Sequence, residues 1–212
     1  MKEGPVNAGD FSPDGKILAL ATGDRLSNWK LMVSTRNRSI HGWLTLVDFA
    51  KGKIVKSLIT HKDESKAVKF SADGRILATG GGDGVVKLWD TATWKELCNL
   101  KGHEGGITSL AFSPDGKLLA SADRYSVKLW DVPNRRELSE LSKQLKGGNS
   151  VAFAPQGCIL ATGFEDEKND WVGTGLEDEG WLFNPNPGKK LLDCNVIRLW
   201  QVRVSHAEKR PK

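Results

Sequence analysis

The 212-residue chain is long enough to form one substantial core, and its 39% hydrophobic and 27% charged residues are typical of a globular protein. Its 31 Lys and Arg residues outnumber 26 Asp and Glu residues, and the net charge of +5 is too mild and too dispersed to indicate nucleic-acid binding. Three widely spaced cysteines predict neither a disulfide framework nor a zinc site, and no apolar stretch is long enough to span a membrane. We therefore expect a cytoplasmic protein with no nucleic-acid or membrane partner.

One phrase recurs four times along the chain. It reads GDFSPDGKILAL at 9–20, VKFSADGRILAT at 68–79, LAFSPDGKLLAS at 110–121 and VAFAPQGCILAT at 151–162. A second phrase follows each copy: TLVD at 45–48, KLWD at 87–90 and at 128–131, and RLWQ at 198–201. Because Phe70, Phe112 and Phe153 are 42 and 41 residues apart, the chain consists of repeats with a nearly constant period.

Each repeat predicts four short strands. In the third, ITSLAF at 107–112 alternates in polarity and ends at SPDG, whose Pro favours a tight turn and whose Gly allows a left-handed backbone. The strands KLLAS at 117–121, SVKLWDV at 126–132 and RRELSEL at 135–141 then follow. Four antiparallel strands within such a period predict one blade of a β-propeller.

Together, GH at 102–103, FSPDG at 112–116 and VKLWD at 127–131 resemble the WD40 repeat family, and the resemblance covers nearly the whole chain. It implies an all-β fold, a partial WD40-type β-propeller with about four blades of four antiparallel strands. Residues 1–212 would form a single propeller segment, with blade 1 at about 5–59, blade 2 at about 66–100, blade 3 at about 107–141 and blade 4 at about 149–204. Members of the family most often hold other proteins together.

The resemblance also implies a buried polar network in each blade. Blade 2 carries the full set of His61, Thr79, Asp83 and Trp89. Blade 3 carries His103, Ser121, Asp123 and Trp130, but only nine residues separate Ser121 from Trp130, against ten between Thr79 and Trp89, which leaves open whether Asp123 reaches His103. Blade 4 keeps Thr162 and Trp200 but has Gln144 in place of the histidine, and blade 1 has Val47 in place of the tryptophan.

A histidine, a hydroxyl and an aspartate in one blade also suggest a hydrolase, but sets that recur with the repeat beside a tryptophan favour a structural role. Calcium binding is similarly disfavoured. Asp166, Asp170 and Glu177 have EF-hand spacing, but Trp171 occupies the position of the required glycine. We therefore expect no catalytic residue, no metal and no cofactor.

Two insertions lengthen the first and fourth repeats between their second and third strands, at 25–44 and 164–194, and should project from the same face. The first has four basic residues and no acid, whereas the second has eight acids and three lysines. Exposed aromatic side chains in loops are natural anchors for a partner. We therefore interpret these residues of the insertions as candidates for partner binding: Trp29, Arg36, Arg38, Trp43, Trp171 and Trp181.

Four repeats leave two blades with one neighbour each, whereas WD40 rings usually close with more blades. Three explanations stay open: a fragment of a longer propeller, which we favour, a propeller completed by another chain, or two copies forming an eight-bladed ring. The sequence predicts a non-catalytic scaffold that binds protein partners through the insertion-bearing face. The alternative is a ligand-binding or enzymatic propeller with a small molecule at the channel mouth.

Overall fold

The computed structural model describes residues 5–23, 41–142, 146–155, 159–165 and 195–201. In these segments the regular structure is entirely β-strand, which confirms the predicted all-β class. No helix in the described part of the chain is long and apolar enough to cross a bilayer.

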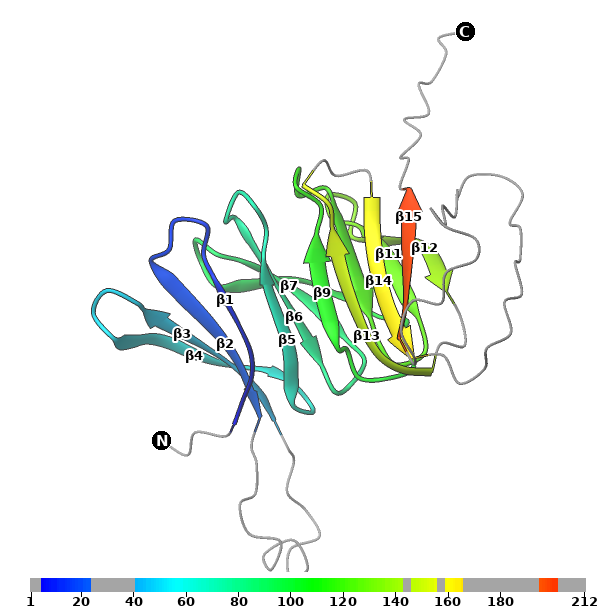
Figure 1. The fold of residues 1–212 in the computed structure, drawn as a ribbon. Coiled ribbons are helices and arrows are strands. Elements are labelled where there is room, and N and C mark those ends of the chain that lie inside the picture. The colour runs from blue at the N-terminus through cyan, green and yellow to red at the C-terminus, as the bar shows by residue number, and fades with distance from the viewer. Residues whose placement is uncertain (1–4, 24–40, 143–145, 156–158, 166–194, 202–212) are drawn as a thin grey trace, which may run out of the picture.

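The strands form four antiparallel sheets, each following chain order, which we call blades 1 to 4. Blade 1 contains β1 (Val6–Phe11), β2 (Ile17–Gly23), β3 (Gly42–Asp48) and β4 (Lys53–His61). Blade 2 contains β5 (Ser65–Phe70), β6 (Ile76–Gly81), β7 (Val86–Asp90) and β8 (Lys95–Leu100). Blade 3 contains β9 (Ser109–Phe112), β10 (Leu118–Ala122), β11 (Val127–Asp131) and β12 (Arg136–Ser142), and the described strands of blade 4 are β13 (Lys146–Phe153), β14 (Ile159–Glu165) and β15 (Asn195–Gln201). Figure 1 shows the blades side by side in an open arc.

The recurring SPDG phrase forms the turn between the first two strands of a blade. In blade 3 the Ser113 hydroxyl donates to Asp115 Oδ1 at 2.6 Å and accepts the Leu118 N–H at 2.9 Å. Gly116 adopts φ 70°, a left-handed conformation that glycine reaches without steric cost. In blades 1 to 3 these turns occupy one end of the blade, which we call the turn end (upper end in Figure 1).

Neighbouring blades pack through their faces, and the first strand of each blade contacts the first strand of the next. Between blades 1 and 2, Ala19, Ala21, Leu44 and Leu46 form one cluster with Val68, Phe70, Leu77 and Trp89. The same pattern recurs at the next junction, where Ala78, Val86 and Leu88 of blade 2 cluster with Phe112, Leu119 and Trp130 of blade 3. Each junction therefore joins a face of small and aliphatic residues to a face that carries the larger side chains.

The two outermost faces of the arc have no neighbouring blade in the described structure. On blade 1 the strand register places Phe11, Leu18, Val47 and Ile54 in one row across the sheet. Phe11 is 45% exposed, although the equivalent Phe70 of blade 2 is only 6% exposed. Position in the arc, rather than residue type, therefore decides which of these aromatic side chains is buried.

Both insertions are shorter than the sequence suggested. Strand β3 already begins at Gly42, which pairs with Gly23, so residues 42–44 belong to the sheet. Strand β14 continues to Glu165, which pairs with Asn195, so 164–165 are also part of a strand. In each blade the two neighbouring strands both extend, so their backbone pairing continues past the part of the sequence that resembles the other repeats. The strand ends next to both insertions lie at the end of the blades opposite the SPDG turns, which we call the insertion end (Figure 1).

Candidate functional site

The structure joins the four polar residues of blade 2 into one chain of hydrogen bonds. The Trp89 indole N–H donates to Thr79 Oγ1 at 3.0 Å, and Thr79 Oγ1 lies 2.9 Å from His61 Nε2. His61 Nδ1 lies 3.1 Å from Asp83 Oδ1. Since a carboxylate only accepts, the proton belongs on Nδ1, and the Thr79 hydroxyl then donates to the unprotonated Nε2. Every polar atom in this chain has a partner of matching character.

Blade 3 forms the same chain. Trp130 donates to Ser121 Oγ at 2.7 Å, Ser121 Oγ lies 2.6 Å from His103 Nε2, and His103 Nδ1 lies 3.2 Å from Asp123 Oδ2. Asp123 therefore reaches His103 despite the shorter loop. The Ser126 hydroxyl contributes a further bond to Asp123 Oδ1 at 3.2 Å.

Burial and hydrogen bonding together set the charges of the two networks. Desolvation lowers the pKa of His61, although the Asp83 carboxylate partly opposes this effect. Burial alone would raise the pKa of Asp123, but the hydrogen bonds from His103 and from the Gly105 and Tyr125 N–H groups outweigh it and hold this pKa well below its usual range. A neutral His61 and an ionised Asp123 follow at neutral pH.

The networks contain the residue types of a hydrolase active site, but their hydroxyl groups are not accessible to a substrate. The hydroxyl-bearing Thr79 and Ser121 are both 0% exposed, and each hydroxyl is held between an indole and an imidazole. A substrate carbonyl would have to displace the packed tryptophan to reach either oxygen. We therefore interpret both networks as structural supports.

What the networks support is the loop structure at the insertion end. Asp83 Oδ2 accepts the Lys62 N–H at 3.0 Å, which ties the β4–β5 loop to the β6–β7 turn. Asp123 accepts the N–H groups of Gly105 at 2.8 Å and of Tyr125 at 2.8 Å, which ties the β8–β9 loop to the β10–β11 turn. The buried Asp123 and the partly buried Asp83 thus fix the backbone of loops that carry exposed side chains such as Lys62, Arg124 and Tyr125.

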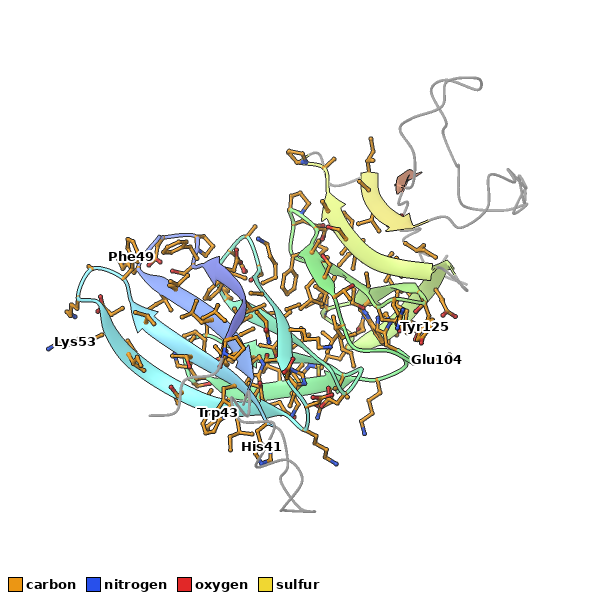
Figure 2. The ribbon with its side chains drawn as sticks, turned by 60° about the horizontal axis from the view of Figure 1, so that its bottom comes forward. His41, Trp43, Phe49, Lys53, Glu104 and Tyr125 are labelled. Atoms are coloured by element: carbon orange, nitrogen blue, oxygen red, sulfur yellow. The ribbon has the colours of Figure 1, made fainter. Side chains whose placement is uncertain are left out.

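Among the described residues of this end, Tyr125 presents an aromatic ring that is 43% exposed. The Arg124 guanidinium lies 5.6 Å from the centre of its ring, within the range of a cation–π contact. Gly105 lies under the ring, since a Cβ at this position would sit 3.1 Å from Tyr125 Cε2. Figure 2 shows Tyr125 beside Glu104, with His41 and Trp43 at the same end of blade 1.

The family model "WD domain, G-beta repeat" matches residues 52–90 and 94–131. The chain carries WD40 repeats. The first matched segment contains the central strands β6 and β7 of blade 2, and the second contains β10 and β11 of blade 3, so each includes one complete polar network. Antiparallel sheets packed side by side are the architecture that WD40 repeats build.

Known WD-repeat proteins match parts of the chain. An uncharacterized WD repeat-containing protein, sll1491, of Synechocystis sp. is 32% identical over 139 residues, which cover 54% of this chain and 40% of that protein. The guanine nucleotide-exchange factor SEC12 of Rattus norvegicus is 46% identical over 54 residues, 26% of this chain and 13% of SEC12. The pre-mRNA-processing factor 19 homolog 2 of Arabidopsis thaliana is 34% identical over 89 residues, 40% of this chain and 16% of that protein. The chain thus spans less than half the length of each of these relatives.

Solved WD40 structures share the fold. The structures of U3-55K and of the RRP9 WD40 repeats each superpose with a TM-score of 0.61 at 16% identity. Each covers 76% of this chain, whereas this chain covers 46% and 45% of theirs. At this identity the likeness establishes the propeller fold alone.

The remaining predicted residues are placed only in part. Thr162 is 1% exposed on β14, and Trp200 lies on β15 opposite Leu160, but its side chain is outside the described part of the structure. Trp43 is a partly buried residue of β3 and pairs with Thr22. Trp29, Arg36, Arg38, Trp171 and Trp181 lie outside the described residues.

Sequence reasoning missed Ser126 and Tyr125. Both follow Asp123 within the turn that is one residue shorter than its counterpart in blade 2, and the repeat pattern gives this turn no fixed residue type. The available signal was the shorter spacing between Ser121 and Trp130, which indicates that this turn is arranged differently from its counterpart in blade 2.

Proposed function

We propose that this chain is a non-catalytic WD40 scaffold that binds protein partners at its insertion end. The observation that carries the proposal is the Tyr125 ring, which is 43% exposed while its own backbone N–H is fixed by the buried Asp123. A large ring presented on a fixed backbone loses little conformational entropy on binding, which is the property of an interface anchor.

The charges at the insertion end support the same conclusion. Lys62, Lys66, Lys101, Glu104 and Arg124 are all exposed residues of the loops or strand starts at this end. Both insertions leave the fold here, one with only basic charges and the other with a large excess of acids. Mixed charge around an aromatic anchor favours orientation and selectivity for a protein partner.

Affinity capture with four forms of the chain tests the proposal. These are the unaltered chain, a variant lacking residues 166–194, Tyr125→Ala, and Phe49→Ala as the matched control. Phe49 is an exposed ring, 59% exposed, in the β3–β4 turn at the turn end. We expect one protein to be retained by the unaltered chain and by Phe49→Ala, and to bind Tyr125→Ala about tenfold more weakly.

Each variant is first compared with the unaltered chain by thermal unfolding, so that a lost interaction is separated from a lost fold. Equal retention by all four forms would contradict the proposed docking end. Retention that depends on Phe49 but not on Tyr125 would move the interface to the opposite end.

A further inference from the structure

A hollow of about 310 Å³ opens at the turn end between blades 1 and 2, far from the loops that carry Tyr125. It lies where three turns meet: the β1–β2 turn, the β5–β6 turn and the β7–β8 turn. Its walls include the rings of Phe70 and Trp94, the turn prolyl ring of Pro13 and the carboxylates of Asp14 and Asp73. This volume is at the lower limit of typical ligand pockets.

Trp94 occupies a backbone position that does not favour tryptophan. Its φ is 56°, in the left-handed region, and its N–H donates to the Asp90 carbonyl at 2.7 Å to close the β7–β8 turn. The equivalent residue of blade 1 is Gly52, with φ 60°, and that of blade 3 is Arg135, with φ 56°. The turn therefore needs the conformation and not the ring, since glycine adopts it without steric cost.

The ring of Trp94 instead contributes to the hollow. It is partly buried and packs against the cluster that joins blades 1 and 2, so its position is fixed. Phe70 lies in the same cluster and is 6% exposed. The hollow thus has an apolar floor and one indole wall that is held by packing.

The rim carries two carboxylates with available acceptor positions. Asp14 Oδ1 accepts from the Ser12 hydroxyl at 2.6 Å, and Asp73 Oδ1 accepts from the Ser71 hydroxyl at 2.7 Å. Each Oδ2 faces only a cation of its own turn, Lys16 Nζ at 3.3 Å for Asp14 and Arg75 Nε at 3.9 Å for Asp73. Those two cations are 79% and 87% exposed and do not line the hollow, and the carboxylates of Asp14 and Asp73 are 54% and 58% exposed, so water screens both ion pairs and reaches both rim carboxylates.

Both rim carboxylates are ionised at neutral pH. The Ser12 hydroxyl and the Lys16 N–H lower the pKa of Asp14 to about 2, and the Ser71 hydroxyl and the Arg75 N–H lower the pKa of Asp73. A lysine or arginine side chain matches this combination, because its alkyl stem fits apolar walls while its charged group prefers aromatic faces and carboxylates.

We propose that this hollow binds a lysine or arginine side chain of a protein partner, with the stem against Phe70 and Trp94 and the charge at Asp14 and Asp73. This site is independent of the insertion end, because it lies at the opposite end of the blades.

Fluorescence polarisation with short labelled peptides tests the proposal. One peptide carries a single lysine among glycine and serine residues, a second carries arginine, and a third carries norleucine, which keeps the stem without the charge. We expect the lysine and arginine peptides to bind at low salt about tenfold more tightly than the norleucine peptide. Equal binding of all three peptides, or no binding of any, would overturn the proposal.

Variants of the chain locate the binding. Trp94→Gly should weaken the binding of the lysine peptide, because it removes the wall that contacts the stem, and should still fold, because Gly52 takes the same backbone conformation in blade 1. Arg135→Gly is the matched control, since it changes the equivalent position of blade 3 outside the hollow, and should leave binding unchanged. The double change of Asp14→Asn and Asp73→Asn keeps an oxygen for the turn hydrogen bonds and should remove most of the salt dependence of binding.

A competition experiment separates a protein side chain from a free amine. We expect n-butylammonium to displace the lysine peptide only at concentrations far above the dissociation constant of the peptide, because the flanking peptide backbone adds contacts. Displacement by butylammonium at the same concentration as unlabelled peptide would overturn the assignment to a protein partner. Unchanged binding of the lysine peptide by Trp94→Gly would overturn the location.

Discussion

Trp89 donates its indole N–H to the Thr79 hydroxyl at 3.0 Å, across the two central strands of blade 2. Trp130 and Ser121 make the same contact in blade 3 at 2.7 Å. In both blades the hydroxyl is hydrogen-bonded to a histidine, and the histidine contacts an aspartate that holds the loops of the insertion end. The tryptophan of each network packs between two blades, and its aspartate holds the loops. One chain of hydrogen bonds therefore connects the packing of the blades to the loops at the insertion end.

Replacing Trp89 should destabilise the fold in two separable steps. Trp89→Phe keeps a large ring but leaves the buried Thr79 oxygen without its indole donor, so we expect a loss of about 1–3 kcal/mol in the free energy of unfolding. Trp89→Ala also removes most of the packing and should cost about 3–5 kcal/mol. Urea denaturation measures both values, and unfolding curves that coincide with that of the unaltered chain would contradict the network.

Stability should fall when the pH drops below the ordinary pKa of histidine. Burial lowers the pKa of His61 in the folded chain below the ordinary value of 6.5. Between this lowered pKa and 6.5, the unfolded chain binds a proton at His61 that the folded chain does not. Unfolding by acid is then favoured first in this window, and again below the ordinary pKa of aspartate, where the lowered pKa of Asp123 adds a second loss. An NMR titration of the His61 imidazole gives the direct check, and a pKa above 6.5 would refute this assignment.

Equivalent phenylalanines of blades 1 and 2 should differ in their contribution to stability. Phe70→Ala creates a cavity at the junction between blades and should cost about 3–5 kcal/mol. Phe11 is 45% exposed and contacts Phe49 edge-on at a centroid distance of 4.9 Å, so Phe11→Ala should cost about 1 kcal/mol or less. Chemical denaturation of the two variants gives their losses in the free energy of unfolding. Equal losses would contradict the prediction and would mean that Phe11 is covered in solution.

The hypothesis of an eight-bladed ring of two copies makes a separate prediction. In that ring blade 1 of one copy meets blade 4 of the other, and the basic segment 25–44 is brought near the acidic segment 164–194. Light scattering should then give twice the chain mass at micromolar concentration, with dissociation promoted by salt. A stable monomer under these conditions would rule the ring out.

The repeat period predicted the four blades, and the resemblance to WD40 repeats predicted the His61 and His103 networks, whose residue types blades 2 and 3 share. The reach of Asp123 was not predictable from spacing, since it depends on how a four-residue turn bends and on Ser126, at whose position blade 2 has Val85. The ends of the insertions were also misplaced, because Gly42 and Glu165 join strands through backbone hydrogen bonds that carry no sequence signature.

The hollow beside Trp94 illustrates a second limit. The sequence shows a tryptophan where the first repeat has Gly52, but the left-handed backbone and the convergence of three turns appear only in three dimensions. Residues that lie in different repeats, such as Asp14 and Asp73, are brought to one rim by the packing of blade on blade. Periodicity alone assigns them to separate turns.

Hydrogen exchange with a captured partner bound tests the central claim most directly, namely that the buried networks support loops which receive a protein. We predict slower exchange of backbone amides in residues 103–106 and 123–126 when the partner is bound, with no gain in exchange at His61 or Trp89. Unchanged exchange in both of these loops, with the partner demonstrably bound, would contradict the claim.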